Sequence, residues 1–225
     1  MSNKTKQTGL TLIEMMIAMV LGLFVTAVII TVFSTNVRSS TENIKMIRLN
    51  QELRGVMTMM VDELKRAGYS GKPSVSVFND DFNISSSCVR YAYDADSDAD
   101  TGDTAPEGNE RFGFKLDDNT VKWTSSGGGP GATLGSPDCD DGTWDKLTDT
   151  NLAFITTLNF DISGSANSRN VSGLTALTAT TGVSVYDVTI TITGTTDFPP
   201  AGADANDPRR TITETVRIRN EDPKD

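Results

Sequence analysis

The feature that most constrains this chain is an apolar run near its start, which extends from Leu10 to Phe33. Glu14 is the only charged residue in the run. At about 1.5 Å of rise per residue, a helix over these positions is long enough to cross the roughly 30 Å hydrocarbon core of a bilayer. The sequence therefore predicts a helix inserted in a membrane.

The segment before the run predicts the orientation of that helix. It is short and polar, and it carries Lys4 and Lys6. Positive charge beside a membrane helix favours the cytoplasmic side, so the chain after Phe33 is expected outside the cytoplasm. A secretory signal has a shorter apolar core, followed by a small-residue cleavage site. Here Gly9 precedes the run, so we interpret the run as a membrane helix.

Glu14 lies close to the start of this helix, where a carboxylate is costly. A charged group at the centre of a membrane helix costs about 2.5 to 3.5 kcal/mol even on mild insertion scales. A buried carboxylate is tolerated when an opposite charge offsets its desolvation. We therefore predict a functional partner for Glu14. The alternative is a carboxylate near enough to the lipid headgroups to reach water.

The helix is expected to continue well beyond the membrane. A glycine at position 68, after two basic residues, is a helix stop signal. We predict one helix from about Leu10 to about Ala67, with residues 10–34 in the membrane and residues 35–68 amphipathic. Its apolar residues recur at three- and four-residue steps on one face. They are Leu53, Val56, Met57, Met60, Val61 and Leu64.

Residues 69–225 are predicted to form one globular domain rich in β-strands. Short alternating runs are bounded by Gly, Asp, Asn, Ser and Pro, which is the pattern of an antiparallel sheet. Asp117, Asp118 and Asn119 predict a hairpin turn. The fold class is α+β, with a long N-terminal helix packed on a C-terminal antiparallel sheet domain. The predicted strands are Cys88–Tyr93, Arg111–Lys115, Val121–Trp123, Thr157–Ile162, Val183–Thr193 and Ile212–Ile218.

Charge and histidine content exclude several classes of function. The formal net charge is −10 at pH 7, and basic clusters are absent, so nucleic acid is not an expected partner. Histidine is absent, which removes the commonest general base and the commonest zinc ligand. No nucleophile motif accompanies these features, so the sequence predicts a protein that is not an enzyme.

The two cysteines, Cys88 and Cys139, are predicted to form a disulfide. They are too few and too far apart for a cysteine zinc site, and they lie in the domain expected outside the cytoplasm, where disulfides persist. Two buried free thiols are the alternative.

An acidic run follows the predicted strand 88–93. If Asp96 takes position 1 of an EF-hand loop, then Asp98, Asp100 and Glu107 take positions 3, 5 and 12, which carry ligands in such loops. The match is incomplete, because position 6 lacks the required glycine and no helices are predicted on either side. These four residues are a candidate calcium site. A solvated acidic loop is the alternative.

The start of the chain resembles the class III signal of type IV pilins and of type II secretion pseudopilins. The resemblance is carried by Lys6-Gln-Thr-Gly9, followed by Leu10-Thr-Leu-Ile-Glu14. It implies the type IV pilin fold and removal of residues 1–9 by a prepilin peptidase, which cuts between Gly9 and Leu10 at the cytoplasmic face. It also implies N-methylation of Leu10, where most relatives have Phe. Glu14 would then pair with the N-terminal amine of a neighbouring subunit.

Further stretches resemble the PilW-type minor pilins and the related J subunits of pseudopili. They are Glu63–Tyr69, Cys88–Asp96, Glu110–Leu116 and Val216–Asn220. The resemblance implies a low-abundance subunit that primes type IV pilus assembly with other minor pilins and the major pilin. Such a subunit waits in the inner membrane with its domain in the periplasm. It then sits at the pilus tip on the cell surface, often beneath a large adhesin.

Three alternatives come from other classes. The first is a J-like minor pseudopilin of a type II secretion system, with the same helix and sheet domain at a pseudopilus tip. The second is the filament-forming major pilin, which the PilW-like stretches and the size of the domain disfavour. The third is a membrane-anchored enzyme, which the lack of histidine disfavours.

Overall fold

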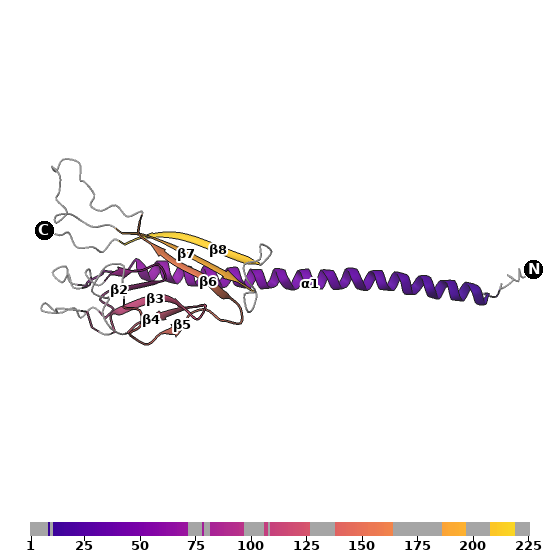
Figure 1. Cartoon of the computed structure of the whole chain (residues 1–225), viewed down its shortest axis with the longest axis horizontal. Helices are drawn as coiled ribbons and strands as arrows, with labels where there is room; N and C mark the ends of the chain where they lie inside the picture. The colour runs from indigo at the N-terminus through magenta and orange to yellow at the C-terminus, as the bar shows by residue number, and fades with distance from the viewer. Residues whose placement is uncertain are drawn as a thin grey trace, which may run out of the picture. The chain divides into compact units, whose positions relative to one another are not determined.

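In the computed structural model the chain divides into two compact units, residues 1–45 and residues 46–225. A 53-residue helix, α1 (Leu12–Leu64), begins in the first unit and ends in the second (Figure 1). The strands of the described chain belong to the second unit. The residues that the structure describes are Gly9, 11–71, Phe78, 82–96, 106–107, 109–126, 138–163, 186–196 and 208–218.

α1 ends in a tightened turn at the predicted stop signal. The Ala67 amide donates to the Leu64 carbonyl at 3.2 Å, so this turn bonds three residues back instead of four. Gly68 follows with a φ of 75°, a left-handed conformation that glycine adopts without strain. The predicted long helix is therefore confirmed, although it ends at Leu64, slightly before Ala67. Leu10 lies outside the described residues.

The strands of the described residues form two antiparallel sheets (Figure 1). Their bounds are β1 Asn83–Ile84, β2 Cys88–Ala92, β3 Arg111–Asp117, β4 Thr120–Thr124, β5 Asp145–Lys146, β6 Phe154–Asp161, β7 Asp187–Thr195 and β8 Arg209–Arg217. The five-stranded sheet has the order β1-β2-β3-β4-β5, and the three-stranded sheet has the order β6-β7-β8. Each predicted strand is present, although residues 183–185 lie outside the described residues. The alternation missed β1 and β5, because two-residue strands are too short to show a period.

The predicted hairpin turn between β3 and β4 is present, but it consists of Asp118 and Asn119 alone, because Asp117 pairs with Thr120 as the last residue of β3. Both turn residues have positive φ, 49° and 55°, the combination of a type I′ turn, whose twist matches that of the flanking strands. Asn119 also bonds to the second sheet. Its Nδ2 donates to the Ile155 carbonyl at 3.1 Å, and its own carbonyl accepts from the Ile155 amide at 2.9 Å. The turn that closes one sheet thus holds β6 of the other.

The core of the second unit combines one face of α1 with the inner faces of both sheets. In β7, buried Val188, Ile190 and Ile192 alternate with partly exposed threonines, which is the period of a half-buried strand. Five of the six predicted core positions of α1 are buried, and Val61 is partly buried. The buried residues of α1 are Leu49, Leu53, Val56, Met57, Met60 and Leu64.

β7 approaches α1 closely at Gly194. A Cβ atom at this position would lie 3.1 Å from Leu49 Cδ1 and 3.2 Å from Leu53 Cδ2. Both distances are shorter than ordinary carbon contacts of about 3.5 to 4.0 Å. The missing side chain therefore leaves the space in which the two leucines pack.

Replacing Leu53 with alanine is expected to destabilise the second unit by about 2 to 5 kcal/mol, because the side chain is fully buried between α1 and the sheets. Urea unfolding of the full chain in detergent micelles, followed by tryptophan fluorescence, measures the change. Gln51→Ala, on the exposed face of the same helix, is the control and should change the free energy of unfolding by less than about 0.5 kcal/mol. Equal effects of the two substitutions would contradict the core position of Leu53.

Candidate functional site

The first turn of α1 carries the predicted assembly residue. Glu14 Oε2 accepts from the Thr11 amide at 3.5 Å and from the Thr11 hydroxyl at 3.4 Å. Thr11 is the N-cap residue, so this is one half of a capping box, and the helix dipole also favours a carboxylate here. Both contacts are long for bonds to a carboxylate, which are usually 2.7 to 2.9 Å. They leave Glu14, which is exposed, with most of its capacity to bind a cation.

The predicted processing residues lie just before this turn. Gly9 is exposed, and Leu10 lies outside the described residues. The capping role of Thr11 was not among the predictions from the sequence. The spacing Thr-x-x-Glu before an apolar run is the signal that could have revealed it.

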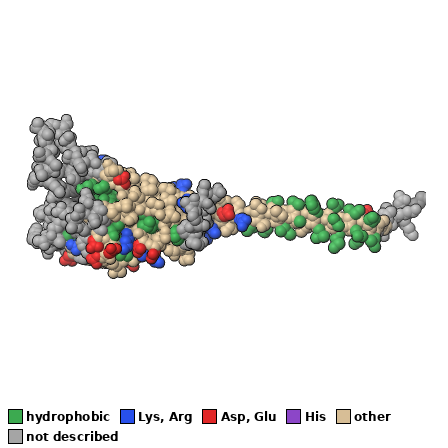
Figure 2. Space-filling view, viewed as in Figure 1, with side chains coloured by type: hydrophobic (Ala, Val, Ile, Leu, Met, Phe, Trp, Pro, Cys, Tyr) green, Lys and Arg blue, Asp and Glu red, His purple; other side chains and the backbone are tan. Residues whose placement is uncertain are grey.

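The side chains of α1 from Leu12 to Phe33 form an exposed apolar surface (Figure 2). Phe24, for example, is 70% exposed. The two threonines of this stretch satisfy their hydroxyls within the helix. Thr26 donates to the Gly22 carbonyl at 2.7 Å, and Thr31 donates to the Ala27 carbonyl at 2.9 Å. By length and composition α1 is able to span a membrane, and Glu14 is the charged residue of the stretch from Leu12 to Phe33.

A cluster of carboxylates lies where the end of β2 meets the start of β3. Asp94 and Asp96 follow β2, and Glu110 immediately precedes β3. The Tyr93 amide donates to the Glu110 carbonyl at 3.2 Å, which extends the pairing of the two strands. One carboxylate oxygen from each of Asp94, Asp96 and Glu110 lies within 4.8 Å of the other two. We call these three residues the acidic cluster.

The environment of Glu110 makes a bare negative charge unfavourable. Its side chain is buried, and its Oε2 accepts from the Glu107 amide at 2.9 Å, whereas its Oε1 has no hydrogen-bond partner. Burial raises the pKa of the Glu110 carboxyl; the bond from Glu107 opposes this, and the charges of Asp94 and Asp96 raise it further. The acidic cluster therefore favours a bound proton or a bound cation.

The predicted calcium residues overlap the acidic cluster at one position. Asp96 belongs to the cluster, and Glu107 is exposed beside it. Asp98 and Asp100 lie outside the described residues. Asp94 and Glu110 were not predicted as ligands from the sequence. The pairing of the predicted strands 88–93 and 111–115 could have revealed them. Antiparallel pairing brings the residue before the second of these strands next to the end of the first.

The acidic cluster adjoins the end of α1. The Gly68 amide donates to the Ala92 carbonyl at 2.8 Å, and the Asp94 amide donates to the Tyr69 carbonyl at 2.9 Å. Asp94 Oδ2 accepts from the Gly71 amide at 2.9 Å. We call these contacts, together with those described next, the helix–sheet junction.

Tyr93 completes the helix–sheet junction through its side chain. Its hydroxyl donates to Glu63 Oε2 at 3.0 Å, and the Arg66 guanidinium lies 4.2 Å from the centre of its ring. Burial raises the pKa of the Tyr93 hydroxyl, and the negative charge of Glu63 adds to this effect. The hydroxyl therefore stays protonated and keeps donating to α1.

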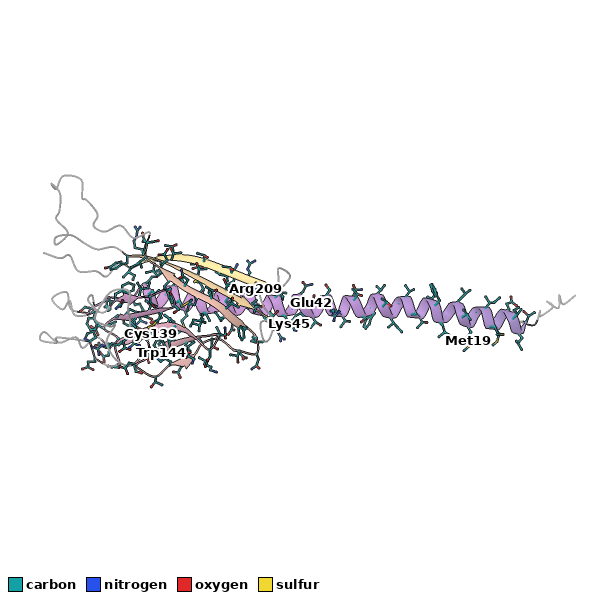
Figure 3. The ribbon with its side chains drawn as sticks, viewed as in Figure 1. Met19, Glu42, Lys45, Cys139, Trp144 and Arg209 are labelled. Atoms are coloured by element: carbon teal, nitrogen blue, oxygen red, sulfur yellow. A yellow bond between two sulfur atoms is a disulfide. The ribbon has the colours of Figure 1, made fainter. Side chains whose placement is uncertain are left out.

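Cys88 and Cys139 are joined by the predicted disulfide, which ties β2 to the segment before β5. The same segment carries Trp144, labelled with Cys139 in Figure 3. Lys115 Nζ donates to the Cys139 carbonyl at 2.7 Å and lies 4.5 Å from the centre of a Trp144 ring. The disulfide and the tryptophan therefore hold this segment against the first sheet.

The helix, its N-terminal signal and the antiparallel sheets define a protein of the type IV pilin class. The model of the family described as prepilin peptidase-dependent protein B matches residues 42–218, and that of the prokaryotic N-terminal methylation motif matches residues 4–30. The chain belongs to the prepilin peptidase-dependent protein B family. These matches confirm the expected resemblance to type IV pilins and support processing by a prepilin peptidase.

A solved structure similar to this chain is a type IV-like pilin from Thermus thermophilus. The two share 11% sequence identity over 77% of this chain and 98% of the other, with a TM-score of 0.42. No curated protein sequence matches the chain significantly.

Removing the disulfide by the double substitution Cys88→Ala and Cys139→Ala is expected to cost about 4 kcal/mol of stability, because the bond closes a 51-residue span in the unfolded chain. Urea unfolding of the full chain in detergent measures the loss. Wild-type protein treated with reductant is the control and should unfold at the same urea concentration as the double variant. Unchanged stability in both samples would contradict a structural role for the bond.

Proposed function

We propose that this protein is a PilW-type minor pilin that primes assembly of the type IV pilus and sits at its tip with other minor pilins. The observation that carries the proposal is an apolar helix with one carboxylate in its first turn, directly after a prepilin signal. The protein acts as a structural subunit and not as an enzyme. Its partners are the prepilin peptidase, other minor pilins, the major pilin and, at the tip, a large adhesin.

The positive charges of the leader and the disulfide support the proposed location of the protein. Lys4 and Lys6 keep the leader in the cytoplasm, and α1 anchors the chain in the inner membrane. A Cys88–Cys139 disulfide fits an oxidising compartment, which supports a periplasmic position for the second unit. Assembly then carries the protein to the pilus tip at the cell surface.

Glu14 is the proposed assembly contact. Cleavage after Gly9 would create an amine on Leu10, and a neighbouring subunit's amine would offset the desolvation of the Glu14 carboxylate in an apolar filament core. A subunit docked a few ångströms out of place would leave two charges unpaired. The pair would therefore set the axial register of the subunits.

Three of the four stretches that resemble PilW lie together in the fold, which supports the finer assignment. Glu63–Tyr69, Cys88–Asp96 and Glu110–Leu116 form the helix–sheet junction and the paired strands beside it. Stretches far apart in sequence thus form one continuous region of the fold. A contact surface specific to the PilW family would require such a region, in which the PilW-like stretches lie next to one another.

Deleting the gene and assaying surface pili and secreted proteins in the same cells tests the proposal. The expected result is loss of pili and of twitching with secretion intact. Intact pili with failed export of folded proteins would contradict the minor-pilin proposal and support the J-like pseudopilin instead. Intact pili and intact secretion would contradict both.

Glu14→Gln is expected to leave membrane insertion and cleavage intact but to reduce incorporation into filaments by about tenfold or more, because a neutral amide cannot offset the charge of the ammonium group. Immunoblots of sheared filaments and of membranes measure both fractions. Glu42→Gln removes a carboxylate from an exposed position later on the same helix, and it should assemble normally (Glu42 is labelled in Figure 3). Normal assembly of Glu14→Gln would refute the charge-pairing account.

A further inference from the structure

The acidic cluster combines two independent features of a cation site. Asp94, Asp96 and Glu110 bring three carboxylate oxygens within 4.8 Å of one another. Separately, Glu110 is only 3% exposed, and its Oε1 has no hydrogen-bond partner. An acidic loop that merely faces water would not bury a carboxylate oxygen without a partner, because a buried charged group that lacks a hydrogen bond is destabilising.

The spacing of the oxygens fits a single ion. Calcium binds oxygen ligands at 2.3 to 2.6 Å, so two ligands of one ion lie at most about 4.6 to 5.2 Å apart. The three oxygens lie within 4.8 Å of one another, which falls inside this range. Calcium also accepts irregular sets of six to eight oxygens, whereas magnesium demands a near-ideal octahedron. Three carboxylates from two strand ends are an irregular set of this kind.

We propose that Asp94, Asp96 and Glu110 bind one calcium ion, with water completing the coordination. These three ligands differ from the four calcium ligands predicted from the EF-hand-like spacing, and the two sets share only Asp96. The ion joins the end of β2 to the start of β3. It also orders Asp94, whose Oδ2 accepts from the Gly71 amide, so calcium stabilises the helix–sheet junction.

The test uses the full chain, purified in detergent, with 1 mM calcium chloride or with EGTA at pH 7. Thermal unfolding is followed by near-ultraviolet circular dichroism. Calcium at about 100 times its Kd is expected to raise Tm by about 5 to 10 °C. Magnesium at the same concentration is expected to give a smaller rise.

Two variants and a control assign the effect to the cluster. Glu110→Gln should lose the calcium-dependent rise, yet in EGTA it should melt no lower than wild type, because the change removes a buried, repelled charge. Asp96→Asn, at an exposed position, should also lose most of the rise. Glu214→Gln removes an exposed carboxylate from β8 and should keep the full rise.

Several results would overturn the proposal. They are equal Tm values of wild type in calcium and EGTA, an equal rise with magnesium, or a full calcium response in Asp96→Asn. A Tm of Glu110→Gln that lies below that of wild type by the same amount in calcium and in EGTA would also overturn the proposal. Such a result indicates that the Glu110 carboxylate has a purely structural role. Each measurement uses purified protein, so failure here leaves the proposed role in pilus assembly untouched.

Discussion

The interaction on which the second unit depends is the burial of one face of α1 against both sheets. Each sheet has an apolar inner face, and the helix supplies the large side chains that fill the space between them. Burying a side chain such as Leu53 or Met60 contributes about 1.5 to 3 kcal/mol. Gly194 leaves room for Leu49 and Leu53, and the Asn119 turn bonds one sheet to the other. The helix is therefore the centre of the domain as well as its connection to the rest of the chain.

The same helix meets two different environments along its length. Its residues from Leu49 onward provide the core side chains, whereas those from Leu12 to Phe33 remain exposed and apolar. An apolar surface of this extent requires lipid or other apolar helices around it. Glu14 is the charged residue of that apolar stretch, and its contacts with Thr11 are long. Membrane anchoring and the proposed filament assembly would each cover this apolar surface.

Local patterns predicted most of the secondary structure, and they failed where the pattern was short. The three- and four-residue steps identified the buried face of α1, and the alternation in β7 identified Val188, Ile190 and Ile192 as core residues. The turn at Asp118 and Asn119 followed from residues that tolerate positive φ. β1 and β5 escaped prediction because strands of two residues carry no period and depend on the neighbour with which they pair.

By itself the sequence determined the long apolar helix, the prepilin signal, the position of Glu14 and the pairing of the two cysteines, because each is a property of residue type, number or local spacing. Only the tertiary structure decided which carboxylates meet. Linear spacing favoured Asp96, Asp98, Asp100 and Glu107, whereas strand pairing brings Glu110 beside Asp94 and Asp96. The physical reason is that antiparallel pairing joins the end of one strand to the start of the next, whatever the length of chain between them.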